Sequence, residues 1–306
     1  MLKRMCISDG RVQEGGSGGP CIEIYIAPDA DERKHLVEDL KIDEHTLASS
    51  LDPDELGRIE FEPEHAALIL KRPKNYSSED NYLFKVASAG LFIFKDVLVV
   101  VMNEDQPLFE GRPFSKIQSV LDIVLRIFYR AIFHFEEHLR GINMLSDSLE
   151  KEVNTAMSNK HLLNMFTLEK SLVYYLNAIA SNGKVIEKLR SSAARLGFTP
   201  EQVEFLDDIL IENAQCFELA QTYSQVLSSL MDARASVVSN NLNVLMKALT
   251  LVMIAIMLPT LVISAFSMNV PMPFGMEQGP VSFWIIMAMA IVSIGAVGFV
   301  WRWKKW

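Results

Sequence analysis

Two long apolar runs lie near the C-terminus of the chain. No charged residue occurs from Ala248 to Met276, and none occurs from Val281 to Val300. The hydrocarbon core of a bilayer is ~30 Å thick, and a helix needs about 20 residues to cross it. Each run is long enough, so the pattern predicts two transmembrane helices. Two such runs in succession argue against the alternative, a pair of core helices in a soluble protein.

The flanks of these runs predict their orientation. Lys247 precedes the first run, and Arg302, Lys304 and Lys305 follow the second among three tryptophans. The connecting segment, residues 269–280, carries no base and a single acid. Basic flanks stay in the cytoplasm and tryptophan favours the membrane interface. We therefore expect a multi-pass protein of the inner or plasma membrane with both termini cytoplasmic.

A very long helix is predicted before the first run. Thr199, Pro200 and Gln202 have the pattern of a capping box with proline at the first helical position. No glycine or proline follows from Glu201 to Leu258, which are 58 residues. Such a helix is roughly 87 Å long, so most of it would form a cytoplasmic stalk continuous with the first membrane helix. A stalk of this length needs partners for its apolar stripe, which favours oligomerisation.

The remaining pattern predicts an α+β membrane protein with three parts. We expect a helix over Ile117–Leu139. We also expect an antiparallel helical pair beside the stalk, formed by 142–182 and 184–196. Further upstream, helices are expected at 31–40 and 44–51, and strands at 21–27, 58–62, 66–71, 82–86, 91–94 and 97–102. The expected domains are a cytoplasmic α/β domain (1–115), a cytoplasmic helical layer and stalk (116–247), and a two-helix transmembrane pore domain with a basic tail (248–306).

Composition narrows the function. The chain has a net charge of −9, and Asp31–Glu64 alone holds 12 acids against 4 bases, which argues against a nucleic-acid binder. Three widely spaced cysteines exclude a disulfide scaffold and a cysteine-rich zinc module, and they fit a reducing compartment. His134 and His138 share a helical face, but no glutamate directly follows the first, so we interpret them as surface histidines and not as a zincin motif. No catalytic triad or nucleotide fingerprint is present, and we expect no enzyme.

The order of an acidic α/β domain, a stalk helix, two membrane helices and a basic tail resembles the CorA magnesium-transporter family. Residues 52–62 resemble the family's acidic segment before a strand, 239–247 the junction of stalk and membrane, and 257–260 the middle of the first span. The family signature Gly-Met-Asn stands here as Ser267-Met268-Asn269, so this is a divergent member whose ion preference is open. The resemblance implies a homopentamer that carries Mg²⁺, with these three residues as the selectivity filter.

One face of the first span is the predicted ion path. Its members are spaced by three or four residues and also match the pore-facing positions of the family. The face is polar at its ends, apolar in the middle and free of acids, so it suits a cation that keeps its water shell, with Asn269 and Asn243 accepting hydrogen bonds from that water. The apolar middle can gate by dewetting. The alternative is ordinary helix packing. The predicted pore-lining residues are Asn243, Met246, Leu249, Met253, Met257, Thr260 and Ser264, with Ser267 at the outer end.

Regulation is implied by the same resemblance, because family members close when Mg²⁺ binds between the cytoplasmic domains of neighbouring subunits. Asp208, next to Asp207, matches a ligand position on the stalk. The partner acid is left open among Asp96, Glu104 and Asp105, and a solvated helix face is the plain alternative for the aspartate pair.

The leading hypothesis is a channel or transporter that moves hydrated Mg²⁺ down the membrane potential, where a divalent ion gains about 4.6 kcal/mol per 100 mV. Mg²⁺ is thus both the transported and the regulatory ion, and the partners are copies of the chain and the bilayer. The alternatives are a Zn²⁺, Co²⁺ or Ni²⁺ transporter of the same fold, or a membrane-anchored scaffold that conducts nothing.

Overall fold

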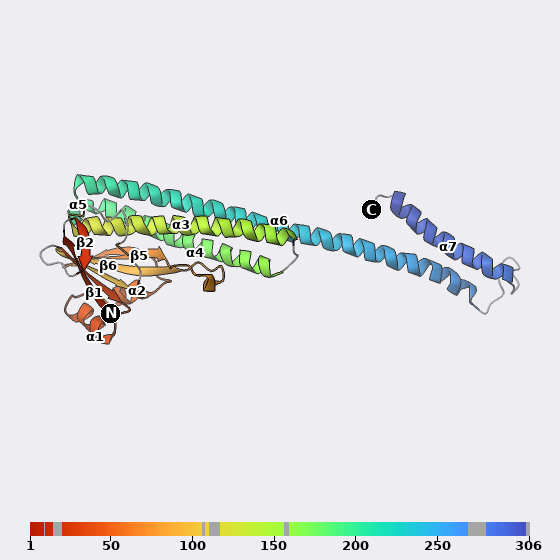
Figure 1. The fold of residues 1–306 in the computed structure, drawn as a ribbon, viewed down its shortest axis with the longest axis horizontal. Helices are drawn as coiled ribbons and strands as arrows, with labels where there is room; N and C mark the ends of the chain where they lie inside the picture. The colour runs from red at the N-terminus through yellow and green to blue at the C-terminus, as the bar shows by residue number, and fades with distance from the viewer. Residues whose placement is uncertain are drawn as a thin grey trace. The chain divides into compact units, whose positions relative to one another are not determined.

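The computed structural model describes residues 1–8, 10–14, 20–105, 108–109, 117–155, 159–268 and 280–303. The chain divides into two compact units, Met1–Met231 and Asp232–Trp306. Helix α6, Pro200–Phe266, is a single helix of 67 residues that begins in the first unit and ends in the second (Figure 1). At 1.5 Å per residue it is about 100 Å long, so the predicted continuity of stalk and membrane helix is confirmed.

The first unit is built on a seven-stranded sheet with the strand order β2-β1-β3-β7-β6-β5-β4. Neighbouring strands are antiparallel except for β3 and β7, which are parallel. The strands are β1 (Leu2–Ser8), β2 (Arg11–Glu14), β3 (Cys21–Ile26), β4 (Arg58–Phe61), β5 (Ala66–Pro73), β6 (Val86–Ile93) and β7 (Val97–Met102).

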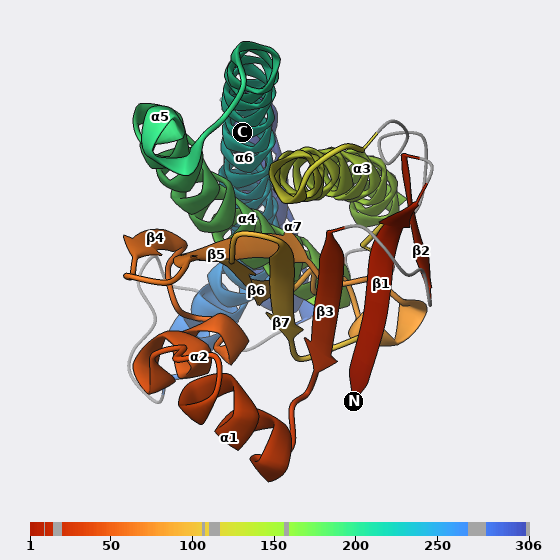
Figure 2. The ribbon, with the colours of Figure 1, turned by 90° about the vertical axis from the view of Figure 1, so that its left-hand side faces the viewer.

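Helices cover both faces of this sheet (Figure 2). The short helices α1 (Ala30–Glu38) and α2 (Glu44–Leu51) lie on one face, and the long helices lie on the other. Alternate side chains of a strand point to opposite faces, so Val100 packs in the core beneath the long helices, whereas Val99 and Val101 pack against α1 and α2. The run Val97–Met102 is therefore apolar throughout because both of its faces are buried.

The helical layer consists of α3 (Val120–Thr155), α4 (Asn159–Ser191), the short α5 (Ala193–Leu196) and the first part of α6. The expected helix boundaries at Gly141 and Gly183 are wrong, because α3 and α4 continue through them. A glycine inside a helix costs only about 1 kcal/mol. Gly183 lies close to α6, since an added Cβ would lie 2.9 Å from Nδ2 of Asn213 and that side chain would have to shift.

Strand β6 also differs from the prediction. We expected two strands, 82–86 and 91–94, separated by small residues, but the structure has one strand from Val86 to Ile93. Its small residues are needed because α2 lies directly on them. A Cβ added at Gly90 would come within 2.6 Å of Cβ of Ser50.

The N-terminal strands β1 and β2 were missed by the sequence prediction. β1 pairs with β3 so that Cys6 lies opposite Cys21, and the two form a disulfide. We expected no disulfide, because without β1 nothing in the sequence brings these cysteines together. Cys216 is free and buried on α6.

Polar side chains of α4 attach this helix to the sheet. Strand β4 pairs with β5 only over Ala66–Ile69, so the backbone of Lys71 has no strand partner on that side. The side chain of Asn182 replaces one: its Oδ1 accepts from the Lys71 amide at 2.8 Å, and its Nδ2 donates to the Lys71 carbonyl at 2.7 Å. Ser171 likewise accepts from the amide of Phe84 at 3.0 Å.

The start of α6 is the predicted capping box. The Thr199 hydroxyl accepts from the Gln202 amide at 3.3 Å, and the Gln202 side chain accepts from the Thr199 amide at 3.0 Å. Gln202 also donates to Asp122 on α3 at 2.7 Å. This second bond fixes where the stalk starts relative to the helical layer.

Candidate ion pathway

The second unit contains the two predicted spans. They are the C-terminal part of α6 and α7 (Pro280–Trp303), whose most apolar 18-residue windows both have a mean hydropathy of 2.4. The window on α6 has none of its residues buried, and the window on α7 has 6% buried. By length and composition both helices can cross a membrane, and their apolar surface suits lipid.

Helix α7 faces one side of α6 across a hollow that Leu251, Ile254 and Leu258 of α6 line. The half-buried residues on this part of α6 follow one another at intervals of four, four, three and four, which is a single helical face. The partly or fully buried residues of α7 also share one face, with Ala290 at its centre. The face of α6 consists of Leu251, Ala255, Pro259, Val262 and Phe266.

The predicted pore-lining residues lie on the opposite side of α6. Successive residues of a helix are turned by about 100°, so Met253 is about 200° from Ala255, and Met257 is about 200° from Pro259. Met253 is 47% exposed and Met257 is 68% exposed. The remaining members of this face are exposed as well: Asn243, Met246, Leu249, Thr260, Ser264 and Ser267.

Two hydroxyl groups on this face donate to the backbone of their own helix. Thr260 Oγ1 donates to the carbonyl of Ile256 at 2.7 Å, and Ser267 Oγ donates to that of Ile263 at 2.8 Å. A hydroxyl has one proton and two lone pairs. With the proton used, each oxygen offers only acceptor sites to whatever passes along the helix.

The filter segment is described in part. Ser267 and Met268 directly follow the end of α6, and both are exposed, whereas Asn269 lies outside the described residues. Ser267 is not among the described residues with positive φ. The replacement of the family's glycine by serine therefore causes no backbone strain at this position.

The two neighbouring aspartates on the stalk, Asp207 and Asp208, have different surroundings. Asp207 forms an ion pair with Arg190 of α4, which lowers the pKa of the Asp207 carboxyl below its usual value. Asp208 is exposed, and within the described chain it makes no hydrogen bond or ion pair. Asp208 is thus the carboxylate that is available to a cation or to a neighbouring subunit.

The three candidate partner acids are also separated by the fold. Glu104 pairs with Lys74, and Asp105 pairs with Lys3 at 2.6 Å, both just after the end of β7. Asp96 lies at the opposite end of β7 and is exposed, with no ion-pair partner among the described residues. The described residues contain no group of three or more His, Cys, Asp or Glu that would hold a metal within one chain.

A family model described as "CorA-like Mg2+ transporter protein" matches residues 23–302, which is most of the chain. The chain belongs to the CorA family. It is a membrane protein and a divalent-cation transporter of CorA type, not an enzyme. The fold class predicted from the sequence is confirmed.

Among curated proteins, the chain resembles the cobalt/magnesium transport protein CorA of Methanocaldococcus jannaschii, with 24% identity over 91% of this chain and 89% of the relative. The solved full-length structure of the M. jannaschii CorA magnesium transporter gives a TM-score of 0.79 at 20% identity, over 99% of this chain and 97% of that one. Full-length CmaX gives 0.75 at 12% identity, over 100% and 98%. The cytoplasmic domain of ZntB from Vibrio parahaemolyticus gives 0.58 at 16%, over 78% and 98%. At these identities the structural likeness concerns the fold.

The histidine pair is not on the surface as expected. His134 and His138 are half-buried between α3 and its neighbours, and burial lowers the pKa of each to about 4. Nδ1 of His138 lies 2.6 Å from the hydroxyl of Tyr175 on α4. The pair is therefore held in the neutral form within the helical layer of this chain.

Proposed function

We propose that this chain assembles as a homopentamer that moves hydrated Mg²⁺ through the membrane, down the potential, along a pore lined by α6. Both termini lie in the cytoplasm. Ser267, Met268 and Asn269 form the outer filter, and cytoplasmic Mg²⁺ closes the pore. Family membership and the polarity of the flanking segments support this proposal.

The single observation that carries the proposal is the position of α7. It lies beside the side of α6 that bears Leu251 and Leu258, and it leaves the side with Met253 and Met257 open. An arrangement of copies around an axis would place the open side inward and α7 outward toward lipid. The polar and apolar positions of the open side would then follow one another along a single central path.

The chemistry of that path fits an ion that keeps its water. Magnesium dehydrates reluctantly and prefers anionic oxygen ligands when it does. The described parts of the two spans contain no carboxylate. Metal-bound water donates hydrogen bonds, and the hydroxyl oxygens of Thr260 and Ser267 are left as acceptors. A ring of Asn269 side chains at the outer mouth and a ring of Asn243 at the inner mouth would do the same.

The gate is assigned to the apolar middle of the path, where Leu249, Met253 and Met257 would form a constriction that empties of water when it narrows. The closing signal is assigned to Asp208. Carboxylates of adjacent subunits repel one another unless a cation bridges them, and a bridge favours the closed packing. Asp96 is the preferred partner, because Glu104 and Asp105 already have lysine partners.

A second candidate is transport of Zn²⁺, Co²⁺ or Ni²⁺ by the same fold. Its support is the serine in place of the family's glycine at Ser267, in the segment that would select the ion. A curated relative is named for cobalt as well as magnesium.

The test is competitive flux into liposomes that contain the purified chain. Mg²⁺, Zn²⁺, Co²⁺ and Ni²⁺ are offered together, with and without an imposed potential. We expect Mg²⁺ to enter, faster with the potential, and Asn269→Ala to abolish uptake while the oligomer persists in size-exclusion chromatography. Preferential uptake of another ion would favour the second candidate. Uptake of no ion would leave the scaffold hypothesis, and full uptake by Asn269→Ala would contradict the filter.

A further inference from the structure

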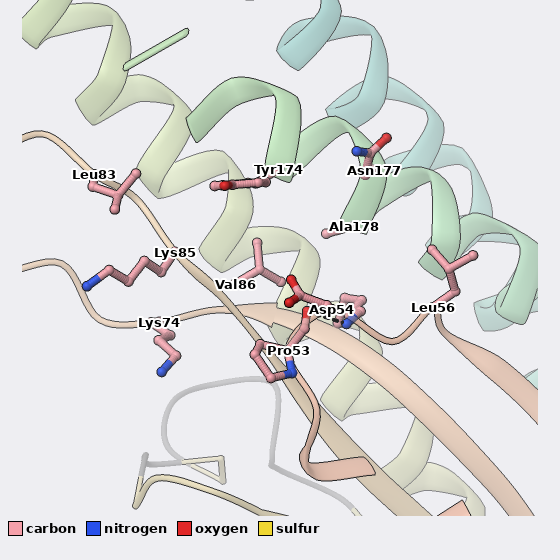
Figure 3. A pocket seen from close by; sticks show the side chains of 11 residues that line it. Pro53, Asp54, Leu56, Lys74, Leu83, Lys85, Val86, Tyr174, Asn177 and Ala178 are labelled. Atoms are coloured by element: carbon pink, nitrogen blue, oxygen red, sulfur yellow. Dashed lines mark hydrogen bonds between the residues drawn. The ribbon is translucent and has the colours of Figure 1, made fainter. Parts of the chain in front are cut away.

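One hollow of the first unit is lined by charged groups that the chain itself neutralises. It lies between α4 and the β5–β6 hairpin, and its lining includes Lys74 and Lys85 (Figure 3). Figure 3 shows both ammonium groups pointing away from Tyr174. Lys74 pairs with Glu104 and Lys85 pairs with Asp80. We therefore assign no ligand to this hollow.

A hollow of the second unit has a different character. It has a volume of about 330 Å³ and lies between α6 and α7. The side chains that line it are apolar, and the indole N–H of Trp301 is the one polar group among them. Such a hollow offers water too few hydrogen-bond partners, so within a bilayer a hydrocarbon chain suits it better. Its lining includes Leu251, Ile254 and Leu258 on α6, and Val297, Val300 and Trp301 on α7.

The lining face of α6 has a base at its start. Lys247 lies four residues before Leu251, and Leu251, Ile254 and Leu258 follow one another at intervals of three and four, so all four share one helical face. Lys247 is the last base before the charge-free run. It is exposed and makes no ion pair with the described part of the chain.

Helix α7 brings a second base to the same end of the hollow. Among the lining residues, Leu251 is the farthest from the C-terminal end of α6, and Trp301 is the farthest from the N-terminal end of α7. Those two helix ends are joined by the connecting segment, so Leu251 and Trp301 mark the same end of the hollow. Arg302 directly follows Trp301, is exposed, and likewise has no ion-pair partner among the described residues.

Acids are distant from this end. In the described part of the second unit, the single acid is Asp232, about 22 Å before Lys247 along the helix. The indole N–H of Trp301 donates to no group of the described residues, and tryptophan favours the membrane interface. Unpaired bases and an indole donor at the mouth of an apolar hollow match a molecule with an anionic head and an apolar tail.

A second copy of the chain complements this hollow less well. Copies with the same orientation in the membrane bring their own Lys247 and Arg302 to the same depth, and like charges repel. The described spans of such a copy contain no acid that would compensate. The charge at this end therefore favours an anionic lipid over a neighbouring span.

We propose that the hollow between α6 and α7 holds an acyl chain of an anionic phospholipid, whose phosphate is bound by Lys247, Arg302 and the indole N–H of Trp301. The phosphate accepts charge-assisted hydrogen bonds from both bases. The acyl chain covers apolar surface that the side chains of the two helices leave open. The lipid thus forms part of the packing between the spans. This inference goes beyond transport and does not depend on which ion passes.

The experiment is native mass spectrometry of the full-length protein in neutral detergent. The probes are phosphatidylglycerol, which has a net negative charge, and phosphatidylcholine, which has none, both with the same acyl chains. We expect phosphatidylglycerol to be retained at least about fivefold more tightly, because two bases contact its head. Equal retention of the two lipids overturns the proposal.

The charged end is tested with K247Q/R302Q, which changes only exposed side chains. This variant should retain phosphatidylglycerol no more tightly than phosphatidylcholine. Lys34→Gln is the matched control, since Lys34 is an exposed lysine of α1 that pairs with Glu38, and it should keep the wild-type preference. An unchanged preference in K247Q/R302Q overturns the proposal.

The apolar part is tested with Val297→Trp, which fills the hollow and should weaken retention of both lipids by about tenfold. Ile291→Trp is the control, because Ile291 is 64% exposed and does not line the hollow, and it should retain both lipids as the wild type does. If a neighbouring copy fills the hollow, Val297→Trp will lower the oligomer mass and leave lipid retention unchanged, which overturns the proposal. Ion flux is not the readout, so a failure here is distinct from a failure of the transport proposal.

Discussion

The two units of the chain satisfy their side chains in different ways. In Met1–Met231, polar groups that would be stranded in the interior find partners within the same chain, as Asn182 does at the edge of β5. In Asp232–Trp306, large apolar side chains such as Met257 and Leu261 are 65% exposed or more. The interior of the first unit is held together mainly by contacts within one chain, whereas much of the apolar surface of the second unit lies open and suits lipid or other copies.

Helix α6 passes through this change of environment without interruption. In the first unit its buried positions recur at three or four residues, with Leu206, Ile209, Asn213, Cys216 and Ala220 facing the helical layer. Leu227 is the last buried residue described on it. Beyond that point the helix is held by its own backbone hydrogen bonds, which a membrane strengthens because no water competes for them. One helix can therefore carry a change of packing in the first unit into the span.

The largest effect on the contrast between the two units is expected from removing a hydrogen-bond partner inside the first unit. Asn182→Leu would leave the amide and carbonyl of Lys71 buried without hydrogen bonds, and we expect a loss of about 3 kcal/mol in the stability of this unit. Amide hydrogen exchange of β5, measured on the full-length protein in detergent, should accelerate accordingly. The matched control is Asn177→Leu on the exposed side of α4, which should leave exchange unchanged. Equal protection in both variants would show that the Asn182 bonds contribute little.

The second unit is tested with two residues of similar size on α6. Met257 belongs to the face turned away from α7, and Leu251 belongs to the half-buried face beside α7. Met257→Ala should widen and hydrate the constriction and raise Mg²⁺ flux by about tenfold. Leu251→Ala removes a similar apolar volume on the side of α7 and should change flux by less than about twofold. Equal effects in liposome uptake would mean that the two faces are equivalent and that α6 does not line the path as proposed.

Local signals in the sequence predicted one part of the fold well. The charge-free runs determined the spans by length alone, and the Thr199–Gln202 capping box located the start of α6. Helix ends at Gly141 and Gly183 were wrong because glycine was taken as a helix breaker. The role of Gly183 depends on Asn213, which is far along the chain and meets it only after folding. Strands β1 and β2 were missed because both carry charged residues and lack a clear apolar alternation, β2 as the edge strand and β1 as its neighbour.

The candidate site also has a part that local sequence spacing predicts and a part that depends on long-range contacts. The proposed pore-lining face of α6 is a repeat of three and four residues within one helix, so the sequence alone predicts it as a face. Asp207 and Asp208 are neighbours with identical chemistry, and the sequence does not separate them. Arg190 separates them, because the turn after α4 brings it against Asp207 alone. Long-range pairs of this kind, like the lysine partners of Glu104 and Asp105, require the three-dimensional fold.

This difference sharpens the regulatory proposal. Asp208→Asn should weaken the dependence of closure on cytoplasmic Mg²⁺ by about tenfold, since one charged ligand of a shared cation is lost. Asp207→Asn removes an exposed ion pair with Arg190 and should alter this dependence little. Protease protection of the full-length protein, titrated with Mg²⁺, reports closure. A larger effect from Asp207→Asn would mean that Asp207, and not Asp208, binds the cation, which contradicts the proposal.

The final effect is that of pH on the two half-buried histidines of the first unit. Burial holds the pKa of His134 and His138 at about 4, below the unfolded value of 6.5. Below pH 6.5 these histidines bind protons in the unfolded chain but not in the folded chain. The free energy of unfolding therefore decreases as the pH drops from 6.5 toward 4. The melting temperature of the full-length protein should decrease over this range, and less so in H134Q/H138Q. His45→Gln, an exposed histidine of α2, is the control and should keep the wild-type slope. An unaltered slope in H134Q/H138Q would mean that acid destabilises the protein through groups other than this half-buried pair.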